Sequence, residues 1–325
     1  MPHVGITDHP FGTTQDIERE VLAAIGADLE LAQATDEETL VALASRSQGL
    51  IACYAPVTAA VVEAAAGAGC KIIARYGIGY DNVDIATATA HGITVTNVPD
   101  YCLDEVADHT FALLLASARG IAAGAREVRQ GRWVAGTTVH SLRGRTLALI
   151  GLGRIGQKTA ERALAFGLRV VAHDPFVQTA PTGVELVSSF EEAVADAHIV
   201  SLHVPMSAEN RHLINASSIA QMRNAPLLVN TSRGGLIDLD AALLALDSGS
   251  ISGLAVDVTD PEPLPDGHPL RTHPNAIVTP HIAFYSEEAQ LELQRRAADE
   301  VRRALAGEPP RSPVNSAALA ARQDR

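Results

Sequence analysis

The sequence has little that would point to disulfides, metal binding, secretion or a membrane. Its 3 cysteines, at positions 53, 70 and 102, are scattered, which favours reduced thiols in a cytoplasmic protein. Neither CxxC nor HExxH occurs, so we expect no metal site. The N-terminus lacks a basic region followed by an apolar core, and we expect no signal peptide. The longest apolar stretch, residues 111–118, is too short to cross a bilayer, so we expect a cytoplasmic protein with no membrane partner.

Basic residues are scarce relative to acidic ones. The chain has 25 lysines and arginines against 38 aspartates and glutamates, and its formal net charge is −13. This balance argues against a general surface for nucleic acid. An anionic substrate would need local positive charge, so individual arginines gain interest. With 325 residues, 47% of them hydrophobic, the chain is long and apolar enough for two domains with large cores.

The stretch from residue 143 to residue 174 has the order of a nucleotide-binding unit. An apolar run at 146–150 leads directly into the loop GLGRIG at 151–156, a helical pattern follows, and a second apolar run ends at Asp174. Strand, glycine loop, helix, strand and acidic residue in this spacing predict that a dinucleotide binds here. The alternative for the loop alone is an ordinary tight turn before a helix.

Each part of this unit has a physical role. Gly151 permits the tight turn, Gly153 lets a pyrophosphate approach the backbone, and Gly156 lets the helix pack close to the sheet. The free N–H groups at the start of the helix, beginning with Arg154, would then face the phosphates. Asp174 can accept hydrogen bonds from a ribose diol and would repel the 2′-phosphate of NADP, so we predict NAD as the cofactor.

Short apolar runs alternate with helical patterns before residue 99 and again in residues 146–279. Such alternation is typical of α/β folds and predicts two doubly wound parallel sheets. The dipeptide Pro99-Asp100 marks the boundary between them. A helical pattern then runs from 103 to about 130, with Gly120 and Gly124 as weak points. Its length suits a bridge between domains or a dimer surface.

The last helical pattern, at 287–306, repeats apolar residues every four positions, which predicts one buried face. Nothing in the second domain needs covering by it, so we expect this helix to return to the first domain. We therefore predict a discontinuous, flavodoxin-like substrate domain (1–99 and 286–325) and a Rossmann NAD-binding domain (100–285), with a cleft between them. Residues 309–325 should form a partly ordered tail.

The loop RYGIG, at residues 75–79, directly follows a predicted strand. Arg75 stands at the carboxyl end of that strand, where open α/β sheets bind ligands. Consecutive backbone N–H groups beside Gly77 could bind an anion. A structural glycine turn is an equally good interpretation of these residues alone.

Three polar sites follow successive strands in the second half of the chain. They are marked by Arg233, Glu262 and His281, and such strand ends face the nicotinamide of a bound dinucleotide. An arginine can bind a substrate carboxylate and polarise the C2 oxygen, and a histidine oriented by a carboxylate can take the hydroxyl proton. These groups suffice to oxidise a 2-hydroxy acid. A surface charge at a turn, a solvated loop residue and a capped core histidine are the alternatives, and position alone leaves both interpretations open.

The motifs GLGRIGQ, VNTSRGGLID, AVDVTDPEP and TPHIA, in this order, resemble the D-isomer-specific 2-hydroxyacid dehydrogenase family. The resemblance covers nearly the whole chain, from the glycine loop near residue 77 to the last helix. It implies an NAD-dependent oxidoreductase that interconverts a small 2-ketoacid and the D-2-hydroxy acid. It also implies catalytic roles for Arg233, Glu262 and His281, with Glu262 orienting the histidine, and a homodimer formed through the NAD-binding domain.

The resemblance further implies which residues bind the two ligands. The expected substrate-binding residues are Arg75, Tyr76, Gly77, Ile78 and Phe284. The expected cofactor-binding residues are Thr110, Gly151, Gly153, Arg154, Ile155, Gly156, Asp174, Pro205, Thr231, Ser232 and Asp257.

Within the family, Arg75 before the glycine loop and the stretch that starts at Phe284 resemble the C-terminal-binding-protein branch. That branch has a tryptophan at the position of Phe284, so phenylalanine keeps an aromatic wall with a different reach. The branch also raises an alternative function, an NAD(H)-sensing binding protein of the corepressor type with little turnover. The complete set of arginine, glutamate and histidine favours the enzyme.

Overall fold

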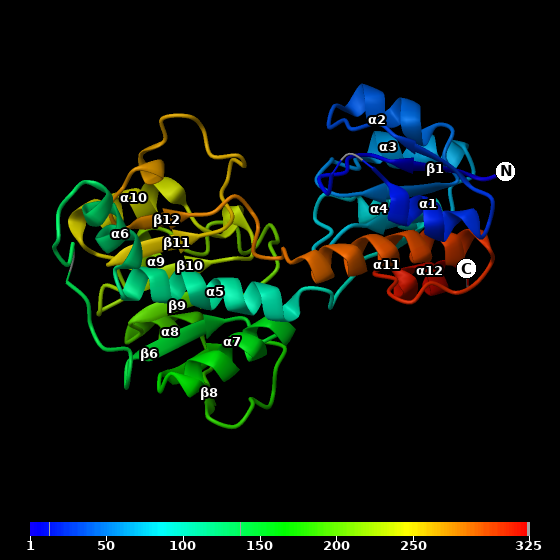
Figure 1. Ribbon diagram of the computed structural model, residues 1–325. Helices are drawn as coiled ribbons and strands as arrows, with labels where there is room; N and C mark the ends of the chain where they lie inside the picture. Colours follow the sequence, from blue (N-terminus) through cyan, green and yellow to red (C-terminus); the bar gives the residue numbers. More distant parts are fainter. Residues whose placement is uncertain (13, 137, 324–325) are drawn as a thin grey trace. The chain divides into compact units, whose positions relative to one another are not determined.

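The computed structural model describes residues 1–12, 14–136 and 138–323. The chain forms two compact units, each with its own sheet (Figure 1). Unit 1 comprises Met1–Tyr101 and Ser286–Arg325, and unit 2 comprises Cys102–Tyr285. All neighbouring strands in both sheets are parallel. The predicted α/β class with two parallel sheets is confirmed.

Unit 1 is built on a five-stranded sheet with the order β2-β1-β3-β4-β5. Its strands are β1 (His3–Ile6), β2 (Asp28–Leu31), β3 (Gly49–Ala52), β4 (Ile72–Arg75) and β5 (Thr94–Thr96). Its helices are α1 (Asp16–Ala23), α2 (Glu37–Ala44), α3 (Ala59–Gly67), α4 (Ile85–Ala90), α11 (Glu287–Leu305) and α12 (Ser316–Gln323). Parallel neighbours need crossover connections, which the helices between the strands supply. The carboxyl ends of the strands therefore share one edge of the sheet.

Helix α11 is remote in sequence but completes the core of unit 1. Ser286 caps it by accepting a hydrogen bond from the Ala289 N–H at 3.0 Å. Its buried face, which includes Leu293 and Val301, packs beside α1 and against β3 and β4 (Figure 1). Gly49 on β3 permits this approach, because a Cβ there would lie 2.7 Å from a Val301 methyl carbon.

The segment after α11 is held against the edge strand β5. Val314 N–H donates to Val95 O at 2.8 Å, and the Asn315 side-chain oxygen accepts from Val95 N–H at 3.0 Å. The Asn315 amide also donates to Ile93 O at 3.0 Å. These bonds satisfy backbone groups that would otherwise face solvent at a sheet edge. The described part of the predicted tail is therefore better ordered than the sequence indicates.

Unit 2 is built on a seven-stranded sheet with the order β12-β11-β10-β9-β6-β7-β8. Its strands are β6 (Thr146–Ile150), β7 (Arg169–His173), β8 (Val184–Leu186), β9 (Ile199–Leu202), β10 (Leu227–Asn230), β11 (Gly253–Val256) and β12 (Ala276–Val278). Its α-helices are α5 (Leu103–Ala118), α6 (Ile121–Arg129), α7 (Arg154–Ala165), α8 (Phe190–Ala195), α9 (Ala216–Ile219) and α10 (Leu239–Ser248), with short 3-10 helices η1 (Gly234–Leu236) and η2 (Pro269–Arg271). The strand order reverses between β6 and β9, where open α/β sheets bind ligands at the carboxyl edge.

Both faces of the unit 2 sheet are covered. Along β6, Leu147 and Leu149 belong to the core on one face, whereas Ala148 and Ile150 belong to the core on the other. Complete burial of a leucine or isoleucine side chain contributes roughly 1.5–3 kcal/mol, so this strand anchors the layers on both sides. Burial on two faces explains why its sequence is a continuous apolar run.

The long helical pattern after residue 103 is two helices. Gly120 has a φ of +61°, a left-handed conformation that ends α5 and precedes α6. Gly124, the other predicted weak point, lies inside α6. Among the residues that the structure describes, no helix is long and apolar enough to cross a membrane.

Candidate active site

Arg233, Glu262 and His281 lie at one edge of the unit 2 sheet. They follow β10, β11 and β12 in turn, and these three strands are neighbours. Because the strands are parallel, their carboxyl ends meet at the same edge. The sheet therefore brings an arginine, a carboxylate and a histidine to adjacent loops.

His281 and Glu262 form a hydrogen-bonded pair, with 2.6 Å between Nδ1 and Oε1. Their side chains are 23% and 39% exposed, so a ligand can reach the pair. The ring of Phe284 lies edge-on to that of His281, with 6.4 Å between the centroids. With Nδ1 bonded to the carboxylate, proton exchange would use the other ring nitrogen, Nε2, and this role of His281 stays a prediction.

The backbone of His281 adopts an unusual conformation. Its φ of +54° lies in the left-handed region, which is uncommon for residues other than glycine and recurs at functional sites. The His281 N–H donates to Asp257 O at 2.8 Å, and this bond holds the turn. The orientation of the imidazole is thus set by the backbone as well as by Glu262.

Asp257 is the buried support of the loop after β12. Its Oδ1 accepts hydrogen bonds from the Thr279 hydroxyl at 2.5 Å and Ile282 N–H at 3.0 Å, and its Oδ2 accepts one from Ala283 N–H at 2.8 Å. Burial alone would raise the pKa of Asp257, but hydrogen bonds from His109, Thr279 and the two backbone N–H groups outweigh burial and lower the pKa. The ionised carboxylate fixes this loop, and contact of Asp257 with the cofactor stays a prediction.

His109 is a site residue that the sequence does not single out. It lies on α5, and its Nε2 is 3.0 Å from Thr279 Oγ1 and 3.5 Å from Asp257 Oδ1. Thr279 is 170 positions away in the sequence, so no local spacing connects the two. The one sequence feature that could have identified His109 is its position next to Thr110, which was expected to approach the cofactor.

The loop after β10 holds Arg233 between backbone groups. Arg233 Nη1 donates to Ser232 O at 2.8 Å, and the Asn230 amide donates to Arg233 O at 2.8 Å. Gly234 lets this loop pack on the next one, because a Cβ there would overlap the carbonyl group of Thr259. The glycine after the arginine is therefore needed to bring the loops of β10 and β11 together.

Four predicted cofactor residues lie at or near this same edge. The hydroxyls of Thr110 and Thr231 are 2.7 Å apart, and the Ser232 hydroxyl donates to Leu202 O at 2.7 Å. Pro205 is exposed after β9. Thr110 is completely buried, so in unit 2 its hydroxyl positions Thr231.

The glycine loop of unit 2 has the geometry that a dinucleotide requires. A Cβ on Gly151 would lie 2.6 Å from His203 O, and a Cβ on Gly156 would overlap Gly151 O. A Cβ on Gly153 would meet nothing within 4 Å, so this part of the loop is open. No side chain caps the first turn of α7, which leaves its N–H groups for a phosphate. The residues present therefore fit a pyrophosphate.

Asp174 lies against this glycine loop. Its Oδ2 accepts a hydrogen bond from Leu152 N–H at 2.8 Å, and its Oδ1 accepts one from Phe176 N–H at 2.9 Å. Each carboxylate oxygen has a further lone pair, so Asp174 can still accept a hydrogen bond from a ribose hydroxyl. Arg154 and Ile155 belong to the second half of the GLGRIG motif and form the first turn of α7.

The predicted substrate-binding loop of unit 1 follows β4. Arg75 Nη1 donates to Tyr76 O at 2.5 Å, and Gly77 has a φ of +141°. The Asn97 amide donates to Ile78 O at 2.7 Å. The Tyr76 side chain is 1% exposed, so it does not line an open pocket in unit 1. Contact of Tyr76 with a substrate would therefore use its backbone.

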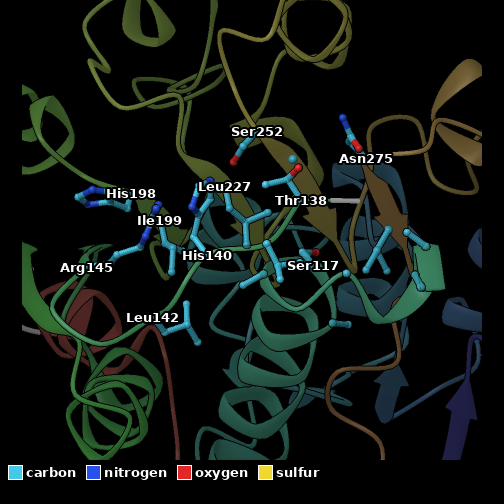
Figure 2. Close-up of a pocket in the computed structure, with 18 of the residues that line it drawn as sticks. Ser117, Thr138, His140, Leu142, Arg145, His198, Ile199, Leu227, Ser252 and Asn275 are labelled. Carbon is cyan, nitrogen blue, oxygen red and sulfur yellow. The ribbon is translucent and has the colours of Figure 1, made fainter. Parts of the chain in front are cut away.

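A separate pocket of about 150 Å³ lies at the opposite edge of the unit 2 sheet (Figure 2). It is lined by the amino ends of β9, β10 and β11, the end of α5 and the segment before β6. Figure 2 shows Ser117, His140, Arg145 and His198 around it. It contains none of the predicted site residues and is distinct from the candidate active site. Among the described residues, no group of three His, Cys, Asp or Glu side chains could hold a metal ion.

Residues 111–283 match the sequence model of the D-isomer specific 2-hydroxyacid dehydrogenase, NAD binding domain. The match includes the glycine loop and the three strand-end sites of unit 2. The cofactor that fits this unit is NAD.

Two curated relatives and one solved structure extend the likeness beyond unit 2. The chain is 38% identical over 304 residues to D-3-phosphoglycerate dehydrogenase of Methanocaldococcus jannaschii, covering 91% of this chain and 57% of the relative. It is 38% identical over 268 residues to glyoxylate reductase of Korarchaeum cryptofilum, covering 80% of each. The crystal structure of the TT0316 protein from Thermus thermophilus superposes with a TM-score of 0.87 at 37% identity, covering 96% of this chain and 99% of that one. The chain thus spans little more than half the length of the first relative.

Proposed function

The chain belongs to the D-isomer specific 2-hydroxyacid dehydrogenase family, and from this premise we propose that it is an NAD-dependent 2-ketoacid reductase. It would interconvert a small 2-ketoacid and the D-2-hydroxy acid. The observation that carries the proposal is the His281–Glu262 pair, 2.6 Å apart and open to a ligand, on loops adjacent to Arg233. Family membership alone would not supply these groups; their arrangement supports the chemistry.

The three residues have separate roles in this proposal. NAD, when bound, supplies or receives the hydride at C2 of the substrate. The Arg233 guanidinium binds the substrate carboxylate and polarises the C2 oxygen. His281 Nε2 donates a proton to that oxygen during reduction and takes it back during oxidation. Glu262 holds the tautomer and stabilises the imidazolium.

The substrate class is proposed from the names of the relatives and from the loop of unit 1. The names glyoxylate reductase and D-3-phosphoglycerate dehydrogenase both indicate small 2-hydroxy or 2-keto acids. Arg75 and the backbone of Gly77 and Ile78 would bind the carboxylate. Phe284, edge-on to His281, would contact the side chain of the acid.

The test is NADH consumption with a panel of 2-ketoacids, including glyoxylate, pyruvate and hydroxypyruvate, followed by chiral analysis of the product. We expect a D-2-hydroxy acid and a clear preference for NADH over NADPH, since Asp174 lies beside the glycine loop. Arg233→Lys keeps the charge but loses the planar fork, so kcat/KM should fall about a hundredfold. Negligible turnover on every acid, with tight NADH binding retained, would instead support a sensor.

We also propose that the protein is a cytoplasmic homodimer that uses the region after α5. Large apolar side chains are exposed there: Ile121 at 58%, Val128 at 51% and Trp133 at 91%. Apolar exposure of this kind in one region is typical of a covered interface. Sedimentation equilibrium should give twice the chain mass, and Trp133→Ser should weaken the dimer. A wild-type monomer at micromolar concentration would contradict this proposal.

A further inference from the structure

Unit 1 contains a buried polar cluster that the proposed chemistry does not use. Its members are His9, Glu18, Tyr76 and Gln294, and none is more than 4% exposed. They come from four elements: the segment after β1, helix α1, the loop after β4, and helix α11. The cluster therefore ties the substrate-binding loop to the body of unit 1.

Glu18 is the centre of this cluster. The Tyr76 hydroxyl donates to Glu18 Oε1 at 2.7 Å, and His9 Nε2 lies 3.4 Å from the same oxygen. The Gln294 amide lies 2.9 Å from His9 Nε2. The Phe11 ring packs edge-on to that of Tyr76, with 5.3 Å between the centroids. The phenol is thus held at its ring by packing and at its hydroxyl by one carboxylate oxygen.

The pKa shifts of His9 and Glu18 both favour the ionised forms of the two groups. Burial alone would raise the pKa of Glu18, but hydrogen bonds from His9 and Tyr76 outweigh burial and lower it. Burial alone would lower the pKa of His9, but Glu18, together with the Gly12 carbonyl and the charge of Asp8, outweighs burial and raises it. Within the described residues, the other oxygen, Glu18 Oε2, is buried without a hydrogen-bond partner.

Such a pair is a poor device for stability alone. Removing ionisable groups from water is costly, and apolar residues of similar volume often stabilise a fold as well or better. An unpartnered buried oxygen adds to that cost. What the carboxylate provides that an apolar side chain cannot is a directional acceptor for the Tyr76 hydroxyl.

The backbone of Tyr76 in turn fixes the position of the Arg75 side chain. The Tyr76 carbonyl accepts the hydrogen bond from Arg75 Nη1 at 2.5 Å. The guanidinium lies directly on the next residue, since a Cβ on Gly77 would overlap Nη1. A shift of the Tyr76 backbone would therefore move both the guanidinium and the N–H groups that follow it.

We propose that Glu18, together with His9, is a positioning residue for substrate binding: it anchors the Tyr76 hydroxyl and thereby holds Arg75 and the Gly77 backbone in place for an anionic substrate. This inference rests on the proposed function of the Arg75 loop. It concerns the free energy of substrate binding and assigns no proton transfer to the cluster.

The first test is Tyr76→Phe, which removes one hydroxyl and keeps the ring. KM for glyoxylate should rise about tenfold, as expected for the loss of a hydrogen bond to a charged group, with kcat and the KM for NADH within about twofold. The dissociation constant of oxalate, a dianion that resembles a 2-ketoacid, should rise by the same factor. Glu18→Gln should act in the same direction.

A double-mutant cycle tests whether the effect passes through Arg75. Arg75→Met should weaken oxalate binding, and Tyr76→Phe should raise the dissociation constant by a smaller factor in that background than in wild type, because only the effect through the Gly77 backbone is left. Full multiplication of the two effects would overturn the proposed connection.

Glu300→Gln is the matched control for Glu18→Gln. Glu300 is also buried in unit 1, but it accepts its hydrogen bonds from the N–H groups of Arg311 and Ser312. Its loss should lower stability without changing oxalate binding.

The two proposals fail in different ways. An absence of ketoacid turnover by the wild type contradicts the proposed function, and oxalate binding then still tests the positioning. If wild type does not bind oxalate, or if folded Tyr76→Phe binds it as wild type does, Glu18 does not position the loop.

Discussion

Unit 1 and unit 2 each contain a histidine paired with a glutamate, and the two pairs differ in exposure. In unit 2, His281 and Glu262 are 2.6 Å apart, with side chains 23% and 39% exposed. In unit 1, His9 and Glu18 are 3.4 Å apart, and both side chains are 0% exposed. Both histidines follow the carboxyl end of a parallel strand, His281 after β12 and His9 after β1. Position at a strand end therefore does not decide what such a pair does.

The exposure of each pair and the groups around it indicate different roles for the same two residue types. A proton donor must meet its substrate, and the partly exposed His281, whose Nδ1 is bonded to Glu262, meets this requirement of its proposed role. His9 is enclosed by protein groups, and its glutamate is bound to a phenol. The exposed pair suits proton transfer, and the buried pair suits the placement of a backbone.

The largest expected effect separates the two histidines by activity. His281→Gln should lower kcat by about two to four orders of magnitude, since it removes the proposed proton donor. His9→Gln should keep kcat within about tenfold, because no reacting atom contacts that ring. Steady-state kinetics with NADH and glyoxylate measures both.

The free energy of unfolding is the control for this comparison. His281→Gln should change it by less than about 1 kcal/mol, as for an exposed pair. A His281→Gln enzyme with wild-type kcat would remove the histidine from the mechanism. An inactive but folded His9→Gln enzyme would erase the distinction between the pairs.

The sequence predicted the exposed pair and missed the buried one for a physical reason. Arg233, Glu262 and His281 stand in motifs that follow strands, and parallel pairing alone brings strand ends to one edge. Glu18 stands in an acidic helix segment, DIERE, which looks like a solvated face. Its partner Tyr76 is 58 positions away, and no periodicity connects them.

The same limit applies to other long-range contacts. Helix periodicity predicted one buried face on α11, and the parallel sheets followed from the alternation of patterns. Asn315, in contrast, completes the edge of β5 from 220 positions away with a side-chain oxygen, which composition and spacing do not reveal. The sequence indicated that the long helical pattern is weak at Gly120, but not that it is interrupted there. The left-handed φ of +61° at Gly120 separates α5 from α6.

The second prediction separates the two glutamates by stability. Glu18→Gln removes the carboxylate that accepts the Tyr76 hydrogen bond and raises the pKa of the buried His9, so the free energy of unfolding should fall by about 2 kcal/mol. Glu262→Gln should change it by less than about 1 kcal/mol while lowering kcat. Urea unfolding followed by circular dichroism measures both variants, and equal losses would mean that burial does not distinguish the pairs.

The smallest effect is the pH dependence of stability that the buried pair contributes. Burial alone would lower the pKa of His9, but Glu18, the Gly12 carbonyl and the charge of Asp8 together outweigh burial and raise it. A histidine of this kind stabilises the fold fully below its unfolded pKa of about 6.5, and that stabilisation is lost as the pH rises through the folded pKa. The pKa of Glu18 is lowered, so its contribution is lost only in acid, as the pH falls through its folded pKa.

The raised pKa of His9 and the lowered pKa of Glu18 define the pH range in which the pair should contribute most to stability. The difference in unfolding free energy between wild type and His9→Gln should be largest below about pH 6.5 and should shrink as the pH rises through the raised folded pKa of His9. Urea unfolding across this range gives the difference, and the His9 ring signal in NMR gives the titration directly. A midpoint at or below that of a free histidine would mean that Glu18 does not stabilise a proton on His9, and the buried histidine would then be neutral.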